Sequence, residues 1–213
     1  MSAIYEKLDE IYLLHAQGIY RLCFLLSRRK EAAKGLTFDS FLRLGAAKEK
    51  QVQSETQAVS LLYEAAVRLC DDYYLKKAHR KPKRALLSRM DLPFAVTDEL
   101  YALLGEPFER RALAGLLASG FSRDEACAMI RRARSLPAPR PSVADEQVRA
   151  CKNVCMTQED SLDVSDQVYA RFAERSVGVE NAIHGFRSVF DRAAPLLALG
   201  VIALFAIALW ITR

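Results

Sequence analysis

The chain has 213 residues, of which 51% are hydrophobic and 27% are charged. These values lie close to the average of globular proteins and exclude a wholly disordered or collagen-like chain. With only 9 Gly and 7 Pro, a sandwich or barrel built on tight turns is disfavoured, and the abundance of helix-forming residues predicts an all-α fold. The net charge of +5 is uneven, because residues 1–90 hold 17 Lys/Arg against 10 Asp/Glu. An anionic partner is therefore expected at the first half of the chain.

The spacing of apolar residues predicts helices over the first half. Two of them cover residues 3–29 and 36–44. A third begins at Ser54, where Ser54 and Gln57 form a capping box that satisfies free backbone N–H groups. A basic run follows this helix, and residues 89–96 form a linker that contains a helix-breaking proline.

Three short helices are predicted next, over residues 98–104, 107–119 and 123–134. Gly120 is placed to end the second, and a capping box at Ser122 opens the third. A proline-rich linker then leads into residues 143–192, which we expect to be helical connecting structure.

Residues 193–212 contain no charged side chain. At 1.5 Å per residue a helix of this length is about 30 Å long, which matches the hydrocarbon core of a bilayer. The alternative, a buried core helix, would normally keep a polar stripe. We therefore expect a single-pass C-terminal tail anchor. Since the N-terminus lacks the features of a signal peptide, the domain before the anchor is expected in the cytoplasm.

The motifs of common enzyme classes are absent from the sequence: it has no glycine-rich phosphate loop, no HExxH and no nucleophile elbow. The three histidines lie far apart. Cys151 and Cys155 share a helix face, but no further metal ligand is near them in sequence. We therefore expect a protein that is not an enzyme and that has neither a metal nor a cofactor.

Three stretches of the first half stand out: HAQGIYRLC (15–23), EAAKGLTFDSF (31–41) and LLYEAAVRLCDDY (61–73). Taken together they resemble a sigma factor of bacterial RNA polymerase, of the extracytoplasmic-function (ECF) type. HAQGIYRLC (15–23) is similar to the opening helix of that family, and EAAKGLTFDSF (31–41) is similar to its E-D-A-E-D-L-T-Q-E-x-F motif. LLYEAAVRLCDDY (61–73), with the basic residues after it, is similar to W-L-Y-R-I-A-R-N-L-C-L-D-Y-L-R-R. Together they cover about residues 10–84, which correspond to the sigma-two domain of the family.

The resemblance implies two surfaces in this region. The first would bind the RNA polymerase core, through residues that match or replace those of the acidic motif: Glu31, Leu36, Thr37, Asp39 and Phe41. The second would bind melted promoter DNA, because cationic side chains neutralise phosphates and aromatic rings stack on bases. Its candidates are Tyr63, Arg68, Tyr73, Tyr74, Lys76, Lys77, Arg80, Lys81, Lys83 and Arg84.

Residues 99–134 are similar to the sigma-four domain, a helix-turn-helix that reads the minus-thirty-five promoter element. LLGEPFERR (103–111) and GFSRDEA (120–126) carry this likeness. The stretch that would form the recognition helix is missing, so the motif is shortened. Three arginines at its end remain candidates for phosphate contacts: Arg131, Arg132 and Arg134.

The expected organisation has four parts: a sigma-two-like domain (1–90), a degenerate helix-turn-helix (91–135), a linker with juxtamembrane helices (136–192) and the transmembrane helix (193–212). The expected function is that of an ECF-like sigma factor tethered to the bacterial inner membrane, where it binds RNA polymerase and promoter DNA to direct transcription initiation. An anti-sigma or other regulatory protein is a possible further partner.

Departures from the family favour an alternative, since Ala32, Lys34 and Gly35 stand where the family has Asp, Glu and Asp. In that alternative, a sigma-derived module binds a protein at the membrane and no longer initiates transcription. A third option is a helical protein whose basic half lies on anionic lipid.

Overall fold

The computed structural model describes residues 3–46, 54–77, 83–87, 90–134 and 142–174. All regular structure in these ranges is helical, which confirms the predicted all-α class. No helix within them is both long and apolar enough to span a membrane. The predicted span at 193–212 lies outside the described residues.

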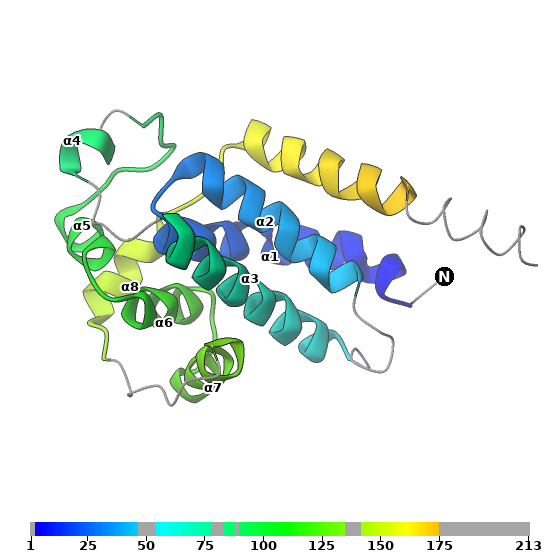
Figure 1. Cartoon of the computed structure of the whole chain (residues 1–213), viewed down its shortest axis with the longest axis horizontal. Coiled ribbons are helices and arrows are strands. Elements are labelled where there is room, and N and C mark those ends of the chain that lie inside the picture. The colour runs from blue at the N-terminus through cyan, green and yellow to red at the C-terminus, as the bar shows by residue number, and fades with distance from the viewer. Residues whose placement is uncertain (1–2, 47–53, 78–82, 88–89, 135–141, 175–213) are drawn as a thin grey trace, which may run out of the picture. The chain divides into compact units, whose positions relative to one another are not determined.

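The first three helices are α1 (Ala3–Ser27), α2 (Lys30–Gly45) and α3 (Glu55–Lys77), and each contacts the other two (Figure 1). As predicted, Ser54 caps α3, because its Oγ accepts a hydrogen bond from the Gln57 N–H at 3.2 Å. However, α2 begins six residues before the predicted start at residue 36. The chain reverses at Arg28, whose φ of 61° lies in the left-handed region.

Tightly buried apolar side chains hold these three helices together. Ile19, Phe24, Phe41 and Leu62 are all fully buried. Two polar side chains of α2 are also buried and satisfy their hydroxyls within the helix: Thr37 donates to the Ala33 carbonyl at 2.7 Å, and Ser40 donates to the Leu36 carbonyl at 2.6 Å. One face of α2, which carries six buried residues of its 16, therefore packs against the core.

Four shorter helices follow the four-residue α4 (Arg84–Leu87). They are α5 (Asp98–Leu104), α6 (Phe108–Ala118), α7 (Arg123–Arg134) and α8 (Asp145–Lys152). The first three agree closely with the predicted ranges, because local signals mark their ends. Gly120 ends α6 at φ 97°, with the Phe121 N–H bonded to the Leu116 carbonyl in a Schellman arrangement. Ser122 and Glu125 form the predicted capping box of α7.

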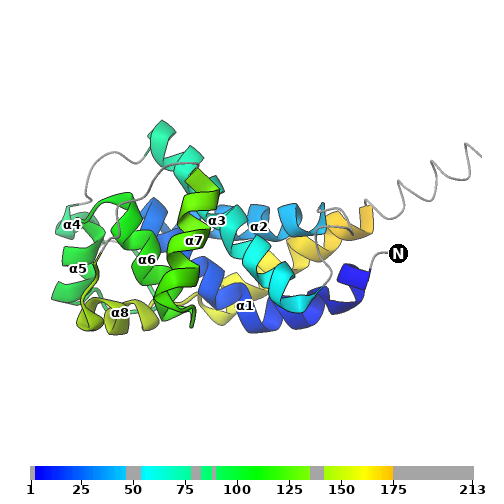
Figure 2. The ribbon, with the colours of Figure 1, turned by 90° about the horizontal axis from the view of Figure 1, so that it is seen from below.

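These helices pack on the first three. Helix α6 lies against α1, and α7 lies against α3 (Figure 2). At Gly115 of α6, an added Cβ would come within 2.9 Å of the Leu22 side chain, so α1 and α6 approach closely there. Residues 1–169 form one compact unit.

A further helix covers 158–174. Thr157 caps it by accepting a hydrogen bond from the Asp160 N–H at 3.0 Å. Its residues up to Tyr169 belong to the first unit, and ion pairs to α2 place its first turns beside that helix (Figure 1). Residues 170–174 begin the second unit, in which Arg171 pairs with Glu174 at 2.8 Å.

Candidate functional site

The residues predicted to bind polymerase divide between the two faces of α2. Leu36, Thr37 and Phe41 are buried against α1 and α3, where they hold the helix in place. Glu31 and Asp39 are exposed. Gly35 lies between these acids on the same exposed stripe, four residues from each, and a Cβ there would meet no atom within 4 Å. We call Glu31, Gly35 and Asp39 the acidic stripe.

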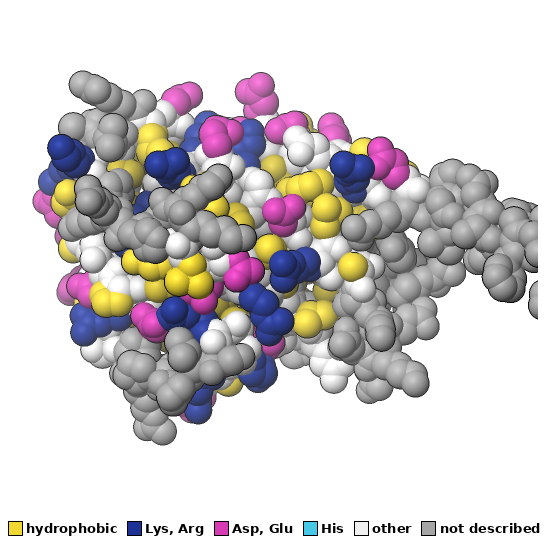
Figure 3. Space-filling model, viewed as in Figure 1, with side chains coloured by type: hydrophobic (Ala, Val, Ile, Leu, Met, Phe, Trp, Pro, Cys, Tyr) yellow, Lys and Arg dark blue, Asp and Glu magenta, His cyan; other side chains and the backbone are white. Residues whose placement is uncertain are grey.

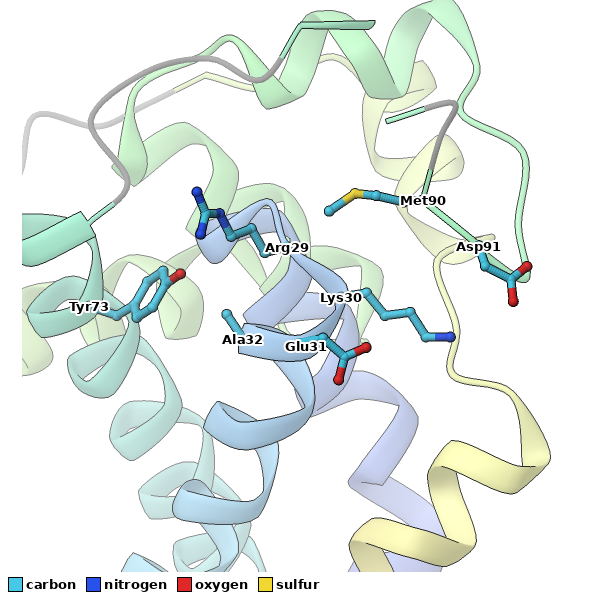
Figure 4. Close-up of a pocket in the computed structure, with 7 residues that line it drawn as sticks. All are labelled: Arg29, Lys30, Glu31, Ala32, Tyr73, Met90 and Asp91. Carbon is cyan, nitrogen blue, oxygen red and sulfur yellow. The ribbon is translucent and has the colours of Figure 1, made fainter. Parts of the chain in front are cut away.

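An open cleft lies beside the first turn of α2, with a volume of about 520 Å³. Figure 4 shows Tyr73 of α3 and Met90 on opposite sides of this turn. The cleft is lined by Arg29, Lys30, Glu31, Ala32, Tyr73, Met90 and Asp91. Tyr73, a predicted DNA contact, and Glu31, a predicted polymerase contact, therefore line the same cleft.

Tyr63, another predicted DNA contact, is part of the core. Its side chain is 1% exposed, and its ring centroid lies 5.9 Å from that of His15 and 4.7 Å from that of Phe121. Burial raises the pKa of Tyr63 and lowers that of His15. In this arrangement the Tyr63 ring joins α1, α3 and the α6–α7 turn and presents no face to a nucleic-acid base.

Tyr74 is half-buried and faces two buried arginines. The guanidinium carbons of Arg28 and Arg111 lie 5.9 Å and 5.3 Å from its ring centroid. Arg111 is fully buried and donates to the carbonyls of Leu25 and Leu26 at 2.6 Å and 2.9 Å. These carbonyls are in the last turn of α1, where no backbone N–H of the helix is left to donate to them. Arg111 therefore ties α6 to the end of α1.

Burial, together with the nearby charge of Arg28, lowers the pKa of Arg111 to about 9. The sequence analysis assigned no role to Arg111. One signal was available: Arg111 lies on the face of α6 that also carries Phe108 and Gly115, both of which pack inward. An arginine on an otherwise apolar face indicates a buried cation with a specific partner.

Two arginines predicted to contact DNA join α7 to α3. Arg132 pairs with Glu64 of α3 through its Nε at 2.6 Å, and its Nη2 lies 3.4 Å from Ser60 Oγ. Arg68 of α3 donates to the Arg132 carbonyl at 3.3 Å. Both arginine side chains remain exposed. A phosphate would therefore have to compete with these internal contacts.

The side chain of Arg134 is less exposed than those of Arg131 and Arg132. Its side chain is 14% exposed and pairs with Asp71 at 3.1 Å and with Glu109. Its guanidinium carbon lies 4.9 Å from the Phe108 ring centroid. The last of the three, Arg131, is exposed and donates to the Cys127 carbonyl of its own helix at 3.4 Å. Of these three arginines, Arg131 has the side chain most open to a ligand.

The basic run 76–84, at and after the end of α3, is described only in part. Lys83 and Arg84 are exposed, and Arg84 pairs with Asp98 at 2.6 Å. The side chains of Lys76, Lys77, Arg80 and Lys81 lie outside the described part. On the face seen in Figure 3, the described cationic and acidic side chains are interspersed and form no single basic patch.

Within the described ranges, no three His, Cys, Asp or Glu side chains come together as a metal site. The arrangement as a whole offers binding surfaces, namely the acidic stripe and the neighbouring cleft. Comparisons of the chain with models of protein families, with curated proteins and with solved structures find no match.

Proposed function

We propose that this chain is a sigma-like transcription factor of the ECF type, which binds core RNA polymerase through the acidic stripe of α2 and promoter DNA through the basic run 76–84 at and after the end of α3. In this proposal residues 193–212 hold it at the bacterial inner membrane, with the helical unit in the cytoplasm. The observation that carries it is the division of α2. The apolar positions of the sigma-like motif, Leu36 and Phe41, face inward, while the acids Glu31 and Asp39 face outward.

This division suits a docking helix. The buried side chains fix the orientation of α2, so the exposed carboxylates need little reorganisation to meet a basic partner. Complementary charges also raise the rate of encounter and select among partners. The cleft beside α2 places Tyr73 near this surface, where its ring suits stacking on an unpaired base.

A second candidate, a protein-interaction module that no longer initiates transcription, is favoured by the arginines of α7. Arg132 and Arg134 are engaged in ion pairs with α3 and α6, and Tyr63 is buried. In this candidate the acidic stripe binds a regulatory protein such as an anti-sigma factor.

The test is binding of the full-length chain, in lipid nanodiscs, to purified core RNA polymerase. Glu31→Lys/Asp39→Lys reverses two charges of the acidic stripe and should weaken binding at least tenfold. The matched control is Glu10→Lys, which reverses an exposed acid of α1. Equal binding by the double variant and the wild type would overturn the role of the stripe. Stripe-dependent capture of another regulatory protein without polymerase would favour the second candidate.

A further inference from the structure

Lys34, which stands where the sigma family has an acid, has a partner within this chain. Its Nζ lies 2.8 Å from Asp160 and 3.4 Å from Asp163, and Lys30 Nζ lies 3.2 Å from Asp160. The side chains of Lys34 and Asp160 are only 19% and 13% exposed. The exchange of charge at position 34 is thus matched by acids on the 158–174 helix.

Further contacts seat residues 156–169 on α1 and α2. Tyr12 of α1 donates its hydroxyl to the Ser161 carbonyl at 2.8 Å, and Gln17 accepts from the Met156 N–H at 2.8 Å. Val164 and Val168 are 2% and 0% exposed. Residues 156–169 are therefore held on α1 and α2 by an apolar face, which includes Val164 and Val168, and by the ion pairs of Lys30 and Lys34, which we call the ionic edge.

The ionic edge lies next to the acidic stripe. Lys30 and Lys34 adjoin Glu31 and Gly35 in sequence, so their side chains leave α2 about 100° around the helix from the stripe. A helix with its side chains is about 10–12 Å across. A helix that is packed on Lys30 and Lys34 therefore occupies the space directly beside the acidic stripe. A protein that binds α2 from that side would need the same space.

We propose that residues 158–169 form an intramolecular latch, which covers the Lys30–Lys34 flank of α2 and is displaced when core polymerase binds the acidic stripe. This inference rests on the proposed function. The latch lies on the same chain as the predicted membrane span, with 23 residues between Tyr169 and Ala193.

The test alters the latch and leaves α2 unchanged. Asp160→Lys/Asp163→Lys sets like charges against Lys30 and Lys34. The matched control is Glu159→Lys, because Glu159 is an exposed acid of the same helix. Asp160→Asn/Asp163→Asn serves as a milder variant that removes charge without adding repulsion. Each full-length protein is measured in nanodiscs by hydrogen exchange of 158–169 and by affinity for core polymerase, with circular dichroism to confirm that the helices remain folded.

The latch predicts faster exchange in 158–169 and about tenfold tighter polymerase binding for the lysine pair. The asparagine pair should change both in the same direction but by less, and Glu159→Lys should leave both unchanged. Faster exchange with wild-type polymerase affinity would overturn the latch while leaving the proposed function intact. Unchanged exchange in the lysine pair would also overturn it. Absence of polymerase binding by every protein would overturn the proposed function, and the latch with it.

Discussion

The buried guanidinium of Arg111 gives the most demanding test of the packing between the first three helices and those that follow. It donates to the carbonyls of Leu25, Leu26 and Glu106, at 2.6, 2.9 and 3.1 Å. Arg111→Ala leaves these acceptors without their donor and opens a cavity against Tyr74. Leaving buried carbonyls without a donor costs about 1–3 kcal/mol, and the cavity left by truncating a large buried side chain adds to this cost, so we expect Arg111→Ala to lower the free energy of unfolding by about 3–5 kcal/mol.

Arg111→Met separates the two causes. Methionine fills much of the volume but donates no hydrogen bond. It also carries no charge, so it avoids the cost of burial that lowers the pKa of Arg111. We expect it to cost about 2 kcal/mol, near the value for buried carbonyls left without a partner. The neighbouring control is Arg110→Ala, which removes an exposed pair with Glu106 and should cost under about 1 kcal/mol.

The assay is urea denaturation of the full-length chain in detergent micelles, followed by far-ultraviolet circular dichroism. A cost for Arg111→Ala that equals that of Arg110→Ala would refute the reasoning. If Arg111→Met lowered the free energy of unfolding by more than Arg111→Ala, methionine would not fit the volume of the site, and the hydrogen bonds would not be the cause of the difference.

Three further predictions concern single sites. Gly35→Asp restores an acid in open space, so we expect polymerase affinity to rise about threefold in titrations, whereas unchanged affinity would count against the acidic stripe. Gly115→Ala crowds Leu22 and should lower the free energy of unfolding by about 1 kcal/mol. By contrast, Gly35→Ala should raise the free energy of unfolding by about 0.5–1 kcal/mol. Similar effects of the two variants in urea denaturation would contradict the close approach of α1 and α6. Burial would raise the pKa of Asp160, but hydrogen bonds from Lys34, Thr157 and Lys30 lower it to about 2. Because these partners hold the folded pKa of the carboxylate below its unfolded value, its stabilising contribution is present above about pH 4 and is lost as the pH falls toward 2. Asp160→Asn should reduce the loss of stability in acid titrations, and an unchanged loss would contradict the ion pairs.

Local signals explain which helices could be predicted. The ends of α6 and α7 follow from Gly120, which takes a left-handed conformation, and from the capping box of Ser122 and Glu125. The start of α2 was missed because the left-handed position before it holds Arg28, where glycine or asparagine would have marked the turn.

The candidate site was less predictable, because its contacts join residues far apart in the chain. Periodicity places Leu36 and Phe41 on the buried face of α2, but it carries no information on which acid meets Lys34. The pairing of Lys34 with Asp160 follows only from the seating of the 158–174 helix. Likewise, charge alone marks Arg132 and Arg134 as phosphate contacts, whereas their acidic partners lie on α3 and α6.

The most direct test of the central claim is run-off transcription with core RNA polymerase, the full-length chain in nanodiscs and DNA from upstream of its own gene. The account predicts transcripts from a defined start that require the chain and that fall at least tenfold with Glu31→Lys/Asp39→Lys. The account would be contradicted if polymerase binds the chain but yields no chain-dependent transcript, both with the wild type and with the Asp160→Lys/Asp163→Lys variant.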